Sequence, residues 1–389
     1  AIPALMKIFH SKNDGVVNTA ILDLSAIGPE AVAPLVSLLG DSNVQVRRGA
    51  AGALEFLPTP KSAAPALELC LKDEDSLVQE NAALALGRFG TNAPATVVPA
   101  LLNALQTETN SVVATTFISV LGLIKEDVPL VVPAIVRYMQ RETNNWGMLS
   151  GPINVLGNFG TNAKPAVPAL VHIVETKSGW QYGVQSPQIS ALVALSKIDP
   201  QAGKPFVPML VHILESKPKL PDADVSPLKI SALVALSHLG SQAAKPSVPV
   251  LLHILESKSN WPEGGDSPLK ISALFVLSKI DPKAAKPFVP RLLHILESKS
   301  DWPEGYLPGQ ILALVALWRI DSEAAEPFFE KWKPNQASVV SELKAFDPEA
   351  AKPFLEKWNA SVTNEVPPKT RGSVRAPNPP SAQTNSASP

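Results

Sequence analysis

A block of 41 residues repeats along this chain and limits what the chain can fold into. Its clearest copy runs from Lys245 to Ala285, the copy before it begins at Lys204, and the next restarts at Lys286 with nearly the same letters. Self-similarity at a fixed period of this size is typical of solenoids, in which each repeat is one supersecondary unit. The repeat therefore predicts a stack of similar units rather than one globular core.

Each copy divides into two helical segments and a loop. In the first segment, VPVLLHILESK, apolar residues recur at helical spacing, and the loop SNWPEGGD then stops the helix. Ser267 and Pro268 suit the cap and first position of a second helix. That second helix is apolar nearly all round, so it has to lie between neighbours. We therefore predict an all-α fold, a right-handed α-solenoid (superhelix) of about ten helical hairpins.

The early unit DSNVQVRRGAAGALEFL resembles the HEAT repeats. It has an Asp in the turn (Asp41), Val46 and Arg47 at the start of the second helix, and a core of small residues with a leucine. The resemblance implies a bent first helix, because a proline recurs there at Pro3, Pro34, Pro65, Pro99, Pro133, Pro168, Pro208, Pro249 and Pro290. Later units replace Arg47 by Gln79, Gln188, Lys229, Lys270 and Gln310. A regular Asp–Arg ladder is therefore expected only in the first repeats.

The spacing of these prolines predicts the domain organisation. Short repeats occupy residues 1–160, repeats of 40 or 41 residues occupy 161–321, and degenerate capping units occupy 322–358. The added length falls in the turn inside each hairpin, where insertions cost little closure entropy. Four enlarged loops should then line up along one edge as a loop ridge, at 177–186, 217–226, 258–267 and 299–308.

The two ends of the chain differ from its repeats. Residues 359–389 are rich in Pro, Ser and Asn and predict a disordered tail. The sequence opens without Met and already inside a first helix, from which we infer that something has been removed upstream. Targeting signals therefore cannot be read, and the localisation is left open.

Composition narrows the possible partners. The net charge is −1, and because the three basic residues after Glu365 meet no acid, everything up to Glu365 carries −4. A mildly acidic body does not suit a phosphate backbone, so nucleic acid is not expected. The single cysteine, Cys70, lies in an apolar run and is expected to be a buried, inert thiol. No apolar run approaches the ~20 residues of a membrane span.

Histidine and glutamate recur three residues apart, which raises the possibility of a metal site. The pairs are His172 with Glu175, His212 with Glu215, His253 with Glu256, and His294 with Glu297. A diiron hydroxylase family with HEAT repeats is similar in fold, but its ligands are adjacent His-Glu pairs, and this chain has none. Stacked helices also lie about 10 Å apart, beyond metal–ligand reach. We expect no metal and no cofactor.

Two sets of residues are candidates for partner binding. The loop aromatics Trp180, Tyr182, Trp261, Trp302 and Tyr306 are either interface anchors or plugs that fold back over their own hairpins. Near the end of the second helices, Lys197, His238, Lys279 and Arg319 share one position, with Lys229 and Lys270 nearby. They form either a strip for an acidic ligand or solvated charges that complement the helix C-termini.

The function predicted from these features is a non-enzymatic scaffold. It would bind a protein or peptide through its concave face, which second helices usually line in this family, and through the loop ridge. The alternative is an enzyme or accessory of the bilin-lyase type, another group with HEAT-like repeats, and the third is nucleic-acid binding. No nucleophile elbow, P-loop, paired Cys or His-Glu-x-x-His occurs, so no catalytic residues are assigned.

Overall fold

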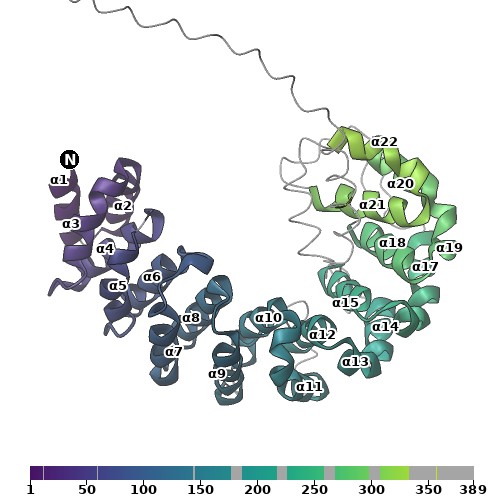
Figure 1. Ribbon diagram of the computed structural model, residues 1–389, viewed down its shortest axis with the longest axis horizontal. Coiled ribbons are helices and arrows are strands. Elements are labelled where there is room, and N and C mark those ends of the chain that lie inside the picture. The colour runs from purple at the N-terminus through teal and green to yellow at the C-terminus, as the bar shows by residue number, and fades with distance from the viewer. Residues whose placement is uncertain are drawn as a thin grey trace, which may run out of the picture. The chain divides into compact units, whose positions relative to one another are not determined.

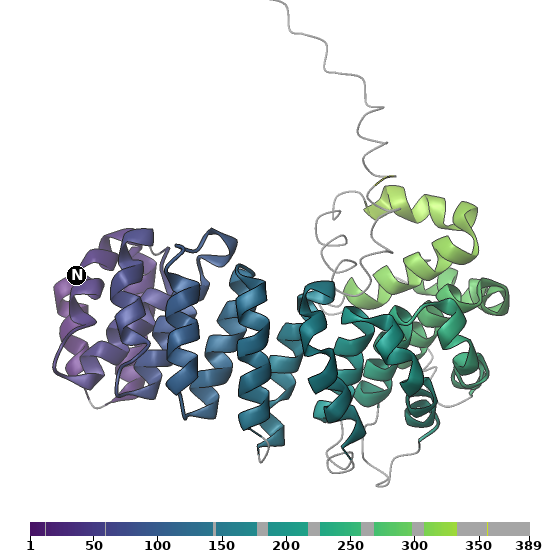
Figure 2. The same cartoon turned by 60° about the horizontal axis from the view of Figure 1, so that its bottom comes forward.

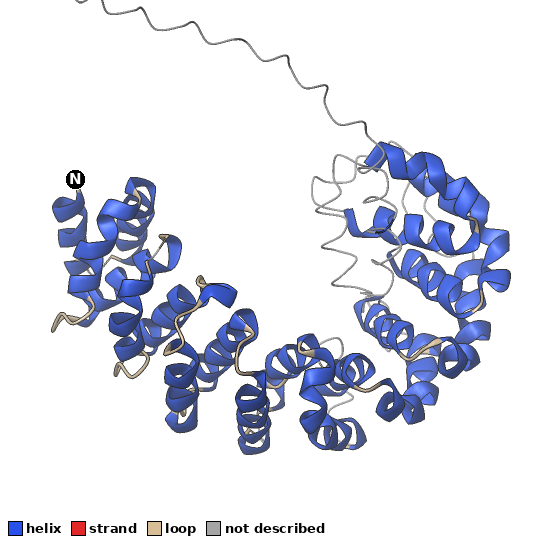
Figure 3. Ribbon diagram, viewed as in Figure 1, coloured by secondary structure: helices blue, strands red, loops and turns tan. Residues whose placement is uncertain are grey.

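The computed structural model describes residues 1–11, 13–58, 60–142, 145–176, 186–216, 226–257, 268–297, 307–332 and residue 356. These belong, apart from residue 356, to one of the chain's two units, Ala1–Trp332. Helices are the only regular secondary structure in the described part (Figure 3). The predicted all-α solenoid is confirmed.

Each hairpin contributes a first helix and a second helix. The first helices are α1 (Ile2–Lys7), α3 (Val32–Leu38), α5 (Ala64–Cys70), α7 (Val97–Thr107), α9 (Val128–Arg141), α11 (Val167–Glu175), α14 (Val207–Glu215), α17 (Val248–Glu256), α20 (Val289–Glu297) and α22 (Ser322–Trp332). The second helices are α2 (Asp14–Ile27), α4 (Val44–Phe56), α6 (Ser76–Gly87), α8 (Ser111–Ile124), α10 (Ser150–Asn158), α12 (Pro187–Ile198), α15 (Ser226–His238), α18 (Pro268–Ile280) and α21 (Leu307–Ile320). The described residues thus form nine hairpins followed by α22.

The second helices contact one another in unbroken order, from α2 through α4, α6, α8, α10, α12, α15 and α18 to α21 (Figures 1 and 2). We call them the second-helix row. Small residues allow the close approach: Ala191, Ala232, Ala273 and Ala313 are all fully buried. Each helix therefore hides its apolar surface against its two neighbours in the row.

Short helical turns join one repeat to the next. Three are the α-helices α13 (Pro200–Gly203), α16 (Ser241–Ala244) and α19 (Pro282–Ala285). The rest are 3-10 turns: η2 (Pro29–Ala31), η3 (Lys61–Ala63), η4 (Gly90–Asn92), η6 (Gly160–Ala166), η8 (Lys204–Phe206), η9 (Lys245–Ser247) and η10 (Lys286–Phe288). Two further 3-10 turns lie inside hairpins instead: η1 (Ile8–His10) between α1 and α2, and η5 (Trp146–Met148) between α9 and α10.

The recurring prolines do not lie where we expected. Pro168, Pro208 and Pro249 occupy the first turn of their α-helices, directly after the 3-10 turns, whereas Pro133 does lie inside α9. In a first turn the missing N–H of proline would have had no intrahelical partner anyway. The bend expected inside most first helices is therefore a junction between a 3-10 turn and an α-helix.

Capping residues fix where several helices begin. Asp199 accepts a hydrogen bond from the Gln201 amide at 3.0 Å, and Asp281 accepts one from the Ala284 amide at 3.0 Å. Ser186, by contrast, makes no cap and donates its hydroxyl to the side chain of Gln188. Ser267 lies outside the described residues.

Candidate interaction surface

Every second helix has one equivalent position, and a buried leucine two residues before it identifies that position. Each second helix carries a leucine in its last turns that is at most 1% exposed: Leu24, Leu54, Leu86, Leu121, Leu156, Leu195, Leu236, Leu277 and Leu317. The residue two places later defines what we call the column: Ala26, Phe56, Arg88, Leu123, Asn158, Lys197, His238, Lys279 and Arg319. The column thus crosses the whole row.

In the early repeats the column carries exposed apolar side chains. Phe56 is 51% exposed and Leu123 is 59% exposed, and Arg88 lies between them. Leu22, one turn before the column in α2, is 62% exposed. The sequence analysis did not single out these three residues, because the exposure of an apolar side chain depends on the packing of its neighbours.

In the later repeats the same position holds the predicted basic residues, and all four are half-buried. The stem of Lys197 lies against α10, where a Cβ on Gly157 would be 3.9 Å from Lys197 Cδ. The guanidinium carbon of Arg319 lies 4.8 Å from the ring centre of Phe275 in the preceding second helix, a cation–π contact. Burial lowers the pKa of Lys197, because the charged form loses water around it.

The other two predicted lysines lie nearer the start of their helices. Lys270 is only 3% exposed, and its Nζ donates a hydrogen bond to the Ser257 carbonyl at 2.7 Å. Burial, reinforced by the charge of Arg291, lowers the pKa of Lys270, and burial also lowers that of Lys229. Lys270 therefore closes the end of its own first helix rather than presenting its charge to solvent.

The predicted loop aromatics cannot be placed. Trp180, Tyr182, Trp261, Trp302 and Tyr306 lie outside the described residues. Their two readings, as anchors or as plugs, both remain predictions.

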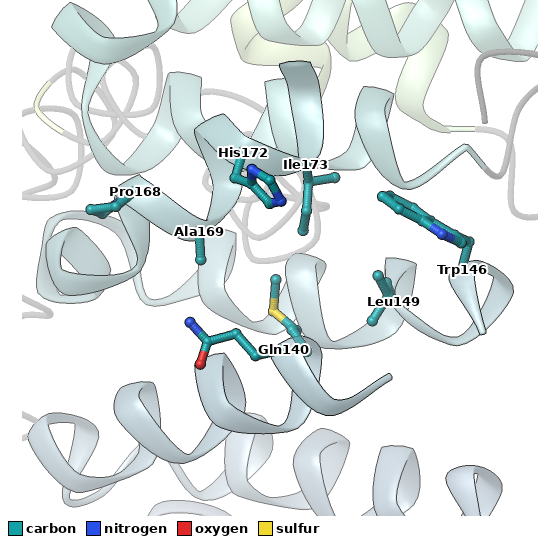
Figure 4. Close-up of a pocket in the computed structure, with 8 residues that line it drawn as sticks. Gln140, Trp146, Leu149, Pro168, Ala169, His172 and Ile173 are labelled. Atoms are coloured by element: carbon teal, nitrogen blue, oxygen red, sulfur yellow. The ribbon is translucent and has the colours of Figure 1, made fainter. Parts of the chain in front are cut away.

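The structure does place a loop tryptophan that sequence reasoning missed. Trp146, in the turn between α9 and α10, lines a pocket of about 380 Å³ together with Leu149 and with His172 and Ile173 of α11 (Figure 4). Met139, Gln140, Pro168 and Ala169 complete the lining. The side chain thus reaches the next repeat instead of covering only its own hairpin. The sequence did offer a signal for Trp146, because it follows a first helix as Trp261 does.

The histidine–glutamate pairs stay apart from one another. His172, His212, His253 and His294 are all exposed on their separate first helices. Among the described residues, no three His, Cys, Asp or Glu side chains come together in a way that could hold a metal ion.

Within the same part of the chain, no single helix has the length and apolar character needed to cross a membrane. One bent pair, Gly15–Ile27 with Pro29–Leu38 at 117°, satisfies length and composition only when both helices are counted together.

Comparison with known proteins agrees with the repeat architecture. Residues 32–122 match the family model for HEAT repeats. The solved structure of yeast importin-β (Kap95p) aligns with 94% of this chain and 54% of its own, at 15% identity and a TM-score of 0.56. The Kap95–Nup1 complex aligns over the same shares at 15% identity and a TM-score of 0.58.

Two cyanobacterial proteins are also similar. Uncharacterized phycocyanin operon protein Z of Pseudanabaena tenuis is 30% identical over 128 residues, which cover 31% of this chain and 61% of that protein. The CpcE–CpcF complex of phycocyanin lyase from Nostoc is 20% identical and covers 64% of this chain and 94% of its own, with a TM-score of 0.38. The chain thus matches 61% of its curated relative's length and about half that of importin-β.

Proposed function

Since the chain is a HEAT-repeat α-solenoid, we propose that it is a non-enzymatic scaffold for a protein or peptide partner. The partner binds the second-helix row, which we expect to line the concave face, and the ridge of enlarged loops. This architecture offers a long surface of repeated positions, and such surfaces suit extended partners.

The observation that carries the proposal is the exposure of Phe56 and Leu123 on the row. Scattered apolar side chains are ordinary on a protein surface, but these two share one structural position and flank Arg88. Aromatic and arginine side chains are the types most enriched among the energetically dominant residues of protein interfaces. Two exposed apolar side chains with a cation between them therefore support a protein partner.

A matched pair of variants tests the proposal. The full chain serves as bait in cross-linking capture, with the double variant Phe56→Asp, Leu123→Asp on the row. The control is Leu69→Asp, Leu130→Asp, because these exposed apolar residues lie on first helices. The row variant should lose a protein that the wild type and the control both capture, while all three melt alike. Capture by the row variant at the wild-type level would refute the use of this surface.

The loop ridge is tested separately through Trp302. If it is an anchor, Trp302→Ala weakens partner binding and leaves the melting temperature unchanged. A loss of stability with unchanged binding would identify Trp302 as a plug and remove the ridge from the proposal.

One observation favours a second candidate, an accessory or enzyme acting on bilin-carrying proteins. The similarity to phycocyanin operon protein Z supports it. Such an enzyme needs a pocket with converging polar groups, and the pocket beside Trp146 offers His172 and Gln140 on an otherwise apolar lining. Mixing the chain with phycocyanobilin and an apo-phycocyanin subunit, and following absorbance, separates the two. Covalent attachment faster than without the chain would favour this candidate over the scaffold.

A further inference from the structure

The last four second helices carry a charge pattern that indicates the chemistry of the partner. We propose that an acidic, extended polypeptide segment binds across α12, α15, α18 and α21, with its carboxylates on Lys197, His238, Lys279 and Arg319. This inference rests on the proposed function and adds the kind of partner and its footprint.

The charge of the second-helix row changes sign along the chain. Its early helices include the acids Asp23, Glu55 and Glu80. The sequences of the last four second helices contain six lysine, arginine or histidine residues and no aspartate or glutamate. Asp199, Asp281 and Asp321, which directly follow three of these helices, accept amide hydrogen bonds from the helix after them. With Lys270 turned inward onto Ser257, the column supplies most of that positive charge.

Two of the column side chains, Lys197 and Arg319, are held in place by the helix before them. Lys197 rests its methylenes against Gly157, and Arg319 stacks on Phe275. His238 Nε2 and Arg319 Nη1 are themselves buried, so a carboxylate would contact these two side chains through their other nitrogens. Held side chains lose little entropy on binding, and charges in partly dehydrated surroundings attract an anion more strongly than charges in open water do. The lowered pKa of Lys197 reports such surroundings.

The spacing of the column suits an extended chain in the polyproline II conformation. Neighbouring helices in contact lie roughly 8–10 Å apart, so one positive group follows another at about that interval. A polyproline II segment advances about 3.1 Å per residue with three residues per turn, so every third side chain returns to the same side after about 9 Å. Four contacts therefore call for an acid at every third position over about ten residues.

A nucleic acid fits this surface less well. Phosphates follow one another about every 3.4 Å along each strand of a duplex, and they need clustered lysines and arginines. The column instead places single charges far apart on a chain with net charge −1. We therefore assign it to a polypeptide, and a nucleic-acid probe becomes an arm of the test.

The test uses fluorescence anisotropy with the full chain and labelled 12-residue probes. The main probe repeats Glu-Pro-Pro four times. One control replaces Glu by Gln, a second has the same composition with its four Glu adjacent, and the third is a 12-nucleotide single-stranded DNA. The column variant is Lys197→Glu, Lys279→Glu, which spares the two side chains with buried nitrogens. The matched control is Lys204→Glu, Lys286→Glu, the same change of charge at exposed positions in the turns before α14 and α20.

We expect the spaced acidic peptide to bind the wild type and the matched control alike. Binding should be at least about tenfold weaker with the column variant or with the Gln peptide, and added salt should weaken it too. Equal binding by the column variant would overturn the inference, as would equal binding of the clustered-Glu peptide. Failure of the spaced peptide to bind, or tighter binding of the DNA, would also overturn it.

Capture of the same cellular partner by both the wild type and the column variant would remove this inference but leave the scaffold function standing.

Discussion

Arg47 and Asp73 join two adjacent repeats through a bidentate pair. Arg47 donates from Nε to Asp73 Oδ2 at 2.7 Å and from Nη2 to Oδ1 at 2.8 Å. Asp73 also accepts the Asp75 amide of its own turn at 3.0 Å. One carboxylate thus fixes both a turn and the contact with the preceding second helix.

In the next repeats, uncharged side chains make the equivalent contact between a second helix and the following turn. Gln79 donates to Glu108 at 3.1 Å, and the Ser111 hydroxyl donates to Glu142 at 2.9 Å. Loss of the arginine after the first repeats, which the sequence showed, therefore changes the donor but keeps the acid of the following turn as acceptor.

Truncation of Asp73 should destabilise the early repeats more than truncation of Arg47. Asp73→Ala leaves the Asp75 amide without its acceptor and the Arg47 guanidinium, held near the Asp41 and Ser42 carbonyls, without its carboxylate. Arg47→Ala removes the pair between repeats and the bonds to those two carbonyls, but it leaves the turn of Asp73 and Asp75 intact. We expect a loss of about 2–4 kcal/mol for Asp73→Ala and about 1–2 kcal/mol for Arg47→Ala. Urea unfolding followed by circular dichroism measures both. Arg48→Ala is the control, because the Arg48 side chain is more exposed (34% against 16%) and should cost less.

The same carboxylates should make the early repeats sensitive to acid. The Arg48 hydrogen bond, opposed by burial, lowers the pKa of Asp75. Burial alone would raise the pKa of Asp73, but the Arg47 and Asp75 hydrogen bonds outweigh it and lower that pKa. A lowered folded-state pKa gives stability that is present above about pH 4 and is lost as pH falls through the folded value. Melting temperatures between pH 6 and 2.5 should fall less steeply in Arg47→Ala, Arg48→Ala, and an unchanged slope would contradict this account.

Gly122 lies where two second helices touch, and alanine there should be harmful. A Cβ on Gly122 would lie 2.8 Å from Val155 Cγ1 and 3.1 Å from Cγ2. We expect Gly122→Ala to cost about 1–3 kcal/mol by overpacking, despite the better helix propensity of alanine. Gly151→Ala is the matched control in α10, because nothing lies within 4 Å of its Cβ position. It should be neutral or stabilising by up to about 1 kcal/mol in thermal unfolding.

Cys70, the chain's single cysteine, should report on opening of the early repeats. It is buried, as predicted, and burial, together with the charge of Asp73, raises its pKa to about 11. At pH 8 only about 0.1% of the buried group is then thiolate. Labelling with a thiol reagent should therefore be slow in native buffer and fast in urea, and Arg47→Ala should speed it. Rapid labelling of the native wild type would contradict this burial.

Sequence reasoning identified the positions that face the core and missed those whose role depends on a neighbouring repeat. Ala273 was recognisable as a contact position because a small residue recurs there in successive copies, and it is fully buried. Lys270 was expected at the surface because lysine usually is, yet it turns inward onto the Ser257 carbonyl. Phe56 was not singled out at all, yet it is half-exposed on the row.

By itself the sequence determined that this chain is a stack of two-helix units, because periodic apolar residues, capping residues and turn residues act within one repeat. Only the tertiary structure decided which of those residues face outward together. Phe56, Leu123 and Lys197 share one column because stacked helices bring equivalent positions side by side. Exposure depends on the packing of the adjacent helices, and no single repeat specifies that packing.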